Sequence, residues 1–168
     1  MRYTTLLLLM FVIIISSCRK TRVTDNRVTT LSATYLTGTG IDTTHNSNGN
    51  INYKMKASNT TCFSYTMSSD IPGAYDAATG SSLYFMVDSG ATTFSYANAE
   101  LEKRHTYYNT YDGWGGGGTW PINKGTISGY KDGYLWQVTI NVPLPVDDNV
   151  TNTNYIKTTS TFRIGAVL

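Results

Sequence analysis

Hydrophobic and polar positions alternate along much of this chain. In residues 51–57, Ile51, Tyr53 and Met55 alternate with polar side chains, and clusters of Gly, Asn, Asp and Ser interrupt such runs at intervals of roughly ten residues. A period of two is typical of a β-strand with one buried face. No window shows a helical period over about a dozen residues. The pattern therefore predicts an all-β domain.

Two hairpins are predicted where alternating runs meet around short polar turns. A three-residue turn at Ser58-Asn59-Thr60 brings the apolar faces of 51–57 and 61–67 into agreement. The expected partners in this first hairpin are Met55 with Phe63 and Tyr53 with Tyr65. A two-residue turn at Ser89-Gly90 gives the same agreement in a second hairpin. The expected partners there are Phe85 with Phe94 and Leu83 with Tyr96.

A third hairpin is predicted around Asp132-Gly133, because an Asp-Gly pair between alternating apolar runs is a strong turn signal. It joins 125–130 to 134–142. The expected partners are Ile127 with Val138 and Gly129 with Trp136, with Gly129 leaving room for the indole. One apolar stripe is then formed by Trp136, Val138, Ile140 and Val142.

The ends of the domain and one charged segment complete the predicted elements. A first strand is expected over 28–36, before a loop at 43–49, and a last strand over 155–167 with Phe162 and Ile164 pointing inward. Ala, Leu, Glu and Lys in 98–105 favour a short helix with Asn98 as its N-cap. About eight or nine strands predict an antiparallel β-sandwich of Ig-like or jelly-roll type, with a small calycin-like β-barrel as the alternative.

The N-terminal residues follow a different pattern. A short head, Met1-Arg2-Tyr3-Thr4-Thr5, carries one positive charge and precedes ten apolar residues, 6–15. As a helix these residues would reach about 15 Å, against roughly 30 Å for the hydrocarbon core of a bilayer. The run is therefore too short to span a membrane stably, and it is typical of the hydrophobic region of a secretory signal.

The next residues, Ile15-Ser16-Ser17-Cys18, resemble the lipobox of bacterial lipoproteins, in which an aliphatic residue and two small residues precede a cysteine. Ile15 stands where Leu is most frequent in that family. The resemblance implies that the Cys18 thiol receives a diacylglyceryl group and that signal peptidase II cuts just before it. The organisation expected from it is a signal peptide at 1–17, a lipidated N-terminus and tether at 18–26, and a single β-domain at 27–168.

Composition narrows the expected partners and location. Charged residues make up 14% of the chain, the formal net charge is +2, and the basic cluster Arg19-Lys20-Thr21-Arg22 adjoins Cys18. Nucleic acid is not an expected partner, whereas this cluster suits the anionic headgroups of a membrane. In the lipoprotein family an Asp after the cysteine directs retention in the inner membrane. Arg19 and Lys20 stand there instead, which favours an outer-membrane lipoprotein facing the periplasm.

The chain has two cysteines, and lipidation of Cys18 leaves Cys62 unpaired. No intrachain disulfide and no cysteine-based zinc site are then expected. A reactive thiolate needs a neighbouring base or helix terminus, and the sequence around Cys62 offers neither. We therefore expect Cys62 to be a small structural residue.

Two segments offer candidate chemistry. In 107–120, YYNTYDGWGGGGTW, aromatic residues surround four glycines, and we interpret the segment as a mobile loop that presents rings to a flat ligand such as a sugar. Its candidate ligand-binding residues are Tyr108, Tyr111, Trp114 and Trp120. The alternative is a long hairpin connection whose rings pack on the sheet edge. The second segment holds Glu100, Glu102 and His105, either as an acid/base or metal cluster or as a solvated turn of helix.

Three functional hypotheses follow. The leading one is a non-enzymatic, lipid-anchored envelope protein whose β-domain is an interaction or accessory module, because the sequence assembles no catalytic set, metal site or cofactor motif. The second is a glycan-binding lipoprotein that uses the aromatic segment; the partner is then a glycan, and otherwise an envelope protein. The third is a hydrolase that uses His105 with Glu100 or Glu102.

Overall fold

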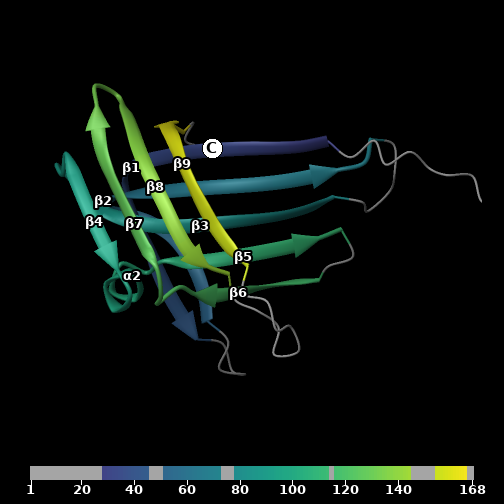
Figure 1. Ribbon diagram of the computed structural model, residues 1–168. Helices are drawn as coiled ribbons and strands as arrows, with labels where there is room; N and C mark the ends of the chain where they lie inside the picture. Colours follow the sequence, from purple (N-terminus) through teal and green to yellow (C-terminus); the bar gives the residue numbers. More distant parts are fainter. Residues whose placement is uncertain (1–27, 46–50, 73–77, 114–115, 145–153, 166–168) are drawn as a thin grey trace, which may run out of the picture.

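The computed structural model describes residues 28–45, 51–72, 78–113, 116–144 and 154–165. The predicted signal peptide, Cys18 and the tether lie outside these residues. Within them the chain is all-β with one short helix, as Figure 1 shows, and the predicted all-β class is confirmed. The elements are β1 (Val28–His45), β2 (Ile51–Asp70), β3 (Thr79–Asp88), β4 (Thr93–Ala97), α2 (Ala99–Lys103), β5 (Tyr107–Asp112), β6 (Gly117–Pro121), β7 (Thr126–Asp132), β8 (Leu135–Pro143) and β9 (Tyr155–Ile164).

The strands form one mixed sheet. In the described part of the chain it has nine strands in the order β4-β7-β8-β9-β1-β2-β3-β5-β6. Neighbours pair antiparallel except β1 and β9, which run parallel and pair at Thr34 with Arg163 and at Tyr35 with Ile164. This junction, the β1–β9 seam, separates a first half (β1, β2, β3, β5 and β6) from a second half (β4, β7, β8 and β9).

Strands β1 and β2 are longer than predicted, and the first predicted hairpin is wrong. β2 runs unbroken through residues 58–60 and pairs with β1, which itself continues to His45. Residues 58–60 face a single residue of β1, Gly38, so they form a bulge in place of a turn. The Thr60 hydroxyl donates to the Thr39 carbonyl at 2.9 Å and fixes this bulge. Figure 1 shows both strands changing direction part-way along their length.

The second predicted hairpin is also wrong, because β3 and β4 lie in different halves of the sheet. The chain does turn after Asp88, whose carbonyl accepts from the Ala91 N–H at 3.2 Å, but β4 then pairs with β7. Phe85 and Phe94 therefore meet across the core, with ring centroids 5.9 Å apart, and not on one ladder. The apolar faces of β3 and β4 match whether the two strands pair on one ladder or face each other across the core. Alternation alone therefore does not distinguish these arrangements.

The third predicted hairpin is confirmed, with a different register. β7 and β8 pair antiparallel around Gly133-Tyr134, where Gly133 has φ +59°. The observed partners are Ile127 with Ile140 and Gly129 with Val138, in place of the predicted Val138 and Trp136. The partner shifts by two positions, so every side chain keeps its predicted face. Gly129 makes room for Phe94 and not for the indole, since a Cβ there would lie 2.7 Å from the Phe94 ring.

The last strand and the helix agree with the sequence in part. Phe162 of β9 is fully buried as predicted, but Ile164 is 65% exposed and its predicted inward position is wrong. The reason is that β9 leaves the core at this point and joins the β1–β9 seam. Helix α2 forms where expected, but Asn98 makes no side-chain cap bond. Its Oδ1 accepts from the Gly125 N–H at 3.2 Å and ties the start of α2 to the residue before β7.

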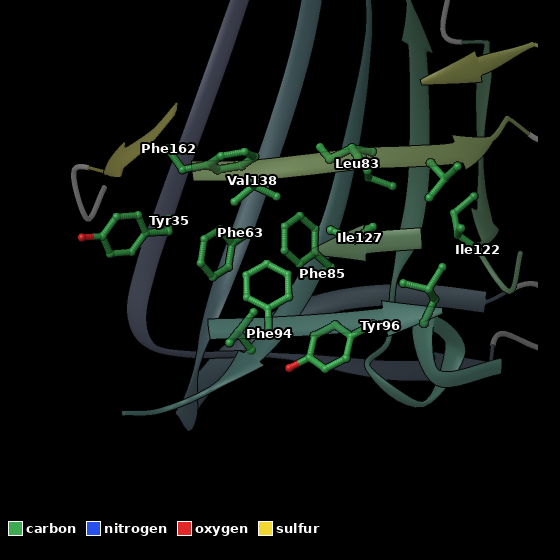
Figure 2. Close-up of a cluster of buried hydrophobic side chains, with 14 of the residues drawn as sticks. Tyr35, Phe63, Leu83, Phe85, Phe94, Tyr96, Ile122, Ile127, Val138 and Phe162 are labelled. Atoms are coloured by element: carbon green, nitrogen blue, oxygen red, sulfur yellow. The ribbon is translucent and has the colours of Figure 1, made fainter. Parts of the chain in front are cut away.

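One aromatic core joins the two halves (Figure 2). Phe63 of β2 lies at its centre, with ring-centroid distances of 4.9 Å to Phe85, 5.4 Å to Trp136 and 5.5 Å to Phe162. The predicted stripe of Trp136, Val138, Ile140 and Val142 is buried. Because Phe63 belongs to the first half and Trp136 and Phe162 to the second, the sheet folds over so that its halves face each other across this core.

Candidate functional site

The aromatic and glycine-rich segment forms a two-stranded ladder over most of its length. β5 and β6 pair antiparallel, with Tyr108 opposite Trp120 and Tyr111 opposite Gly117. The interpretation as a mobile loop is therefore wrong for both strands, and Trp114 lies outside the described residues. Gly117 shows why glycine is needed here, because it has φ +130° and a Cβ would lie 2.1 Å from the Thr110 carbonyl oxygen.

The structure divides the candidate ligand-binding residues between two faces of the sheet. Tyr108 and Trp120 share the face that carries the core, with ring centroids 6.4 Å apart. Tyr108 is buried, whereas Trp120 is 39% exposed. Tyr111 points to the opposite face, since successive side chains of a strand alternate, and its ring covers Gly80 of β3. The rings of Tyr108 and Trp120 therefore lie on one face of the sheet, and the ring of Tyr111 lies on the other.

The face with Trp120 continues past the core, and the described residues place no second layer over this part of it. Directly paired residues across a sheet lie on the same side, and two rows of this kind follow the buried rows of the first half. The first row is Leu31, Met67, Ser81, Thr110 and Gly118. The second row is Thr29, Ser69, Thr79 and Asp112. Leu31 is 61% and Met67 46% exposed, so we call these two rows, together with Trp120, the open face.

A groove of about 470 Å³ lies on the open face. Its lining includes Met67, Ser81, Tyr108, Thr110, Tyr111 and Asp112. The Trp120 ring lies over Gly118, which pairs with Thr110, and so lies beside this lining. Asp112 is the charged member of the lining in the described residues. The groove thus combines several hydroxyl groups with one carboxylate and apolar side chains.

Hydrogen bonds hold the polar side chains of the β5–β6 hairpin in place. The Asp112 carboxylate accepts from the Gly116 N–H at 2.6 Å, and the Thr110 hydroxyl accepts from the Gly118 N–H at 3.2 Å. On the opposite face, the Asn109 amide donates to the Thr119 hydroxyl at 2.9 Å. The groove edge is therefore fixed by side chain to backbone bonds that cross the hairpin.

Four residues of the groove were not predicted from the sequence as site residues: Met67, Ser81, Thr110 and Asp112. One local signal was present, because strict alternation in 108–112 places Tyr108, Thr110 and Asp112 on one face of an extended strand. The remaining members come from β2 and β3, far away in the sequence. Their contribution depends on the strand order, which local alternation does not contain.

The charged segment after β4 is organised by ion pairs. These pairs are Glu100 with Lys103 at 3.8 Å, Glu100 with Arg104 at 3.7 Å, and Arg104 with Asp88. The hydrogen bond from the Arg104 guanidinium lowers the pKa of Asp88. His105 has φ 48° and donates its backbone N–H to the Glu102 carbonyl at 2.9 Å. In the described residues, no group of three His, Cys, Asp or Glu side chains is placed to hold a metal ion.

Cys62 lies on the outer face of the first half, away from the groove. It is buried beside Ile41 and Tyr107. Burial raises the pKa of the Cys62 thiol to about 12, so the thiol stays protonated at neutral pH. Tyr107 is covered by stacked rings at centroid distances of 3.8 Å from Tyr53 and 4.8 Å from Tyr84. This packing suits a structural role for Cys62.

Comparison with protein-family models, curated proteins and solved structures found no match for this chain. Among the described residues, no helix has the length and apolar character that crossing a membrane requires. The N-terminal motif and the open face are therefore the two features of the chain that bear on its function.

Proposed function

We propose that this chain is a lipid-anchored protein of the bacterial cell envelope whose β-domain is a non-enzymatic interaction module. The observation that carries the proposal is the motif Ile15-Ser16-Ser17-Cys18 after ten apolar residues. A signal peptide at 1–17 is removed, Cys18 carries the lipid, and residues 18–26 connect it to the domain. Two or three acyl chains hold a protein firmly to a bilayer, whereas a single chain holds it only marginally.

The residues after Cys18 support a location in the outer membrane, facing the periplasm. Arg19, Lys20 and Arg22 place positive charge next to the lipid. Each such residue contributes on the order of 1 kcal/mol of attraction to anionic headgroups. The partner of the domain is then another component of the envelope, either a protein or a glycan.

We also propose that the two halves of the sheet form an antiparallel β-sandwich of Ig-like or jelly-roll type. The ring contacts of Phe63 with Trp136 and Phe162 support this arrangement, because they join the facing halves. In the described residues, β4 and β6 are the two edges of the sheet and do not pair with each other. Unpaired edges favour the sandwich over the calycin-like barrel.

The anchor is tested by expressing the full chain in a bacterium supplied with an alkyne-tagged fatty acid. The wild-type protein is expected in the membrane fraction, with the tag on its N-terminal peptide and Cys18 as its first residue by mass spectrometry. Cys18→Ser removes the acceptor thiol and should abolish the tag. Cys62→Ser is the matched control and should keep it, because Cys62 is buried in the domain. A tag that persists in Cys18→Ser, or a mature N-terminus without lipid, contradicts the proposal.

A further inference from the structure

Trp120 provides an exposed aromatic plane on the open face. Its six-membered ring lies over the α-carbon of Gly118, where a Cβ would come within 2.4 Å of the ring. Glycine at this position lets the indole lie against the strand. Tyr108 supports the indole from the neighbouring strand at an interplanar angle of 33°. A ring held against a sheet in this way, and 39% exposed, offers a preformed stacking surface.

The polar groups of the groove lie directly beside this plane. Thr110 pairs with Gly118, over which the Trp120 ring lies, and Ser81 pairs with Thr110 in the same row. Neighbouring strands are about 4.8 Å apart, so each of these hydroxyl groups is about one strand spacing from the next. The groove of about 470 Å³ has a volume typical of small-ligand sites. A ligand that covers Trp120 therefore also reaches Thr110 and Ser81.

The chemistry of the open face selects one class of ligand. A pyranose ring has an apolar face of C–H groups, which stacks on an aromatic plane, and a rim of hydroxyl groups, which exchanges hydrogen bonds with Ser, Thr and carboxylate side chains. Asp112 is the charged residue of the described lining. A carboxylate accepts hydrogen bonds from sugar hydroxyls and repels phosphate, sulfate and uronate groups. The groove therefore suits neutral sugars.

The position of the groove relative to the proposed anchor agrees with an envelope ligand. Thr29 lines the groove and lies next to Val28, the first residue of β1. Val28 lies ten positions after Cys18, and ten residues of extended chain span at most about 35 Å. The lipid would hold the groove within that distance of the membrane surface, where both soluble oligosaccharides and envelope-bound glycans are found.

We propose that the open face binds a neutral oligosaccharide, with one pyranose ring stacked on Trp120 and its hydroxyl groups bonded to Thr110, Ser81 and Asp112. This inference rests on the proposed function, since it names the ligand of the interaction module. It also replaces the four aromatic candidates with a different set, in which Trp120 alone supplies the stacking plane.

The proposal is tested by isothermal titration of the full lipoprotein in nanodiscs with hexasaccharides. The neutral panel is built from glucose, mannose and xylose, and an oligogalacturonate serves as the anionic probe. Saturable binding of at least one neutral sugar is expected. Trp120→Ala and Thr110→Val should each weaken it at least tenfold, which corresponds to about 1.4 kcal/mol. Thr110→Val is nearly isosteric and keeps the test valid if Trp120→Ala fails to fold.

Two matched controls make the result specific to the open face. Thr119→Val alters the opposite face of the same hairpin, and Tyr134→Ala removes a ring that is 86% exposed at the β7–β8 turn. Both should leave the affinity unchanged. The proposal is overturned if neither the neutral sugars nor isolated cell-wall sacculi bind, if the anionic probe binds more tightly than every neutral sugar, or if Thr119→Val weakens binding as much as Trp120→Ala.

The source of the sugar and the anchor are read out separately. If the protein is retained on isolated cell-wall sacculi but does not bind free hexasaccharides, the ligand is the envelope polymer. If it binds free hexasaccharides in the titration, the ligand is a soluble oligosaccharide. Retention must also be lost in Trp120→Ala. The fatty-acid tag should stay unchanged in this variant, so failure of binding with an intact tag contradicts only the open-face proposal. Binding without a tag contradicts only the proposed anchor.

Discussion

Among single residues, two glycines that both have a positive φ differ in how closely they are packed. Gly125 has φ +95° and Gly133 has φ +59°, and both values are unfavourable for other residues. A Cβ on Gly125 would lie 2.4 Å from the Asn141 carbonyl oxygen, whereas nothing lies within 4 Å of a Cβ on Gly133. Gly125 is thus constrained by both conformation and space, and Gly133 by conformation alone.

We expect Gly125→Ala to lower the free energy of unfolding by about 3 kcal/mol or more, because backbone strain and a clash with the main chain add together. Gly133→Ala, the matched control, should cost about 1–2 kcal/mol from the left-handed conformation alone. Urea titration followed by tryptophan fluorescence measures both values. Equal midpoints for the two variants would show that the contact with Asn141 is unimportant.

The sequence predicts the burial of a side chain well where alternation within its own strand determines that burial. The stripe of Trp136, Val138, Ile140 and Val142 follows from alternation, and all four are buried. Tyr111 illustrates the opposite case, because its ring covers Gly80 of another strand, on the face away from Trp120. A residue whose environment comes from a distant strand has no local signal.

Among the strands, turn residues and bulge residues are hard to distinguish in sequence. Residues 58–60 are polar and separate two alternating runs, as a turn would, yet they form a bulge within β2. The partner strand decides between these outcomes, since Gly38 of β1 lies opposite the bulge. The third hairpin was predictable because Asp132 and Gly133 constrain the chain locally.

The end of β9 allows a test of how deeply one strand is anchored. Phe162 is fully buried and contacts Phe63, whereas Ile164 is largely exposed beyond it. Phe162→Ala should lower the free energy of unfolding by about 3–5 kcal/mol, and Ile164→Ala should change it by about 0.5 kcal/mol or less. Thermal unfolding followed by circular dichroism measures both. A large loss in Ile164→Ala would mean that β9 continues inward past Phe162.

For the whole molecule, the two halves of the sheet are coupled through one core. Phe63 of the first half contacts Phe94, Trp136 and Phe162 of the second half, while the β1–β9 seam provides two paired positions in the described residues. Side-chain packing, more than the ladder at the seam, therefore joins the halves. Neither half retains its buried face once the other is removed.

We expect the halves to unfold together as one cooperative unit. In a Trp114→Phe, Trp120→Phe background the fluorescence reports Trp136 of the second half, and far-UV circular dichroism reports all strands. The two urea transitions should coincide, and Phe63→Ala should shift both to the same lower midpoint. Separate midpoints for the two probes would instead show two independently stable halves.

The all-β class was predictable from sequence, and the strand order was not. Composition and the period of two depend on each residue and its near neighbours, and they predict most of the strands, although β5 and β6 were interpreted as a loop. The position of β4 beside β7, and of β1 beside β9, depends on contacts between distant segments. The apolar faces of β3 and β4 match equally well on one ladder and across a core. The packing of Phe85 against Phe94 across the core decides between these two arrangements.

The strand order also determines how long each strand remains without its pairing partner during synthesis. β4 is synthesised before β7, the strand with which it pairs. β1 is synthesised first and pairs with β9, which is synthesised last. During that interval Phe94, Tyr96 and the edge of β1 have no partners from the second half. Unpaired apolar edges associate readily with other chains. The yield of folded protein should therefore depend on how soon the last strands follow the first.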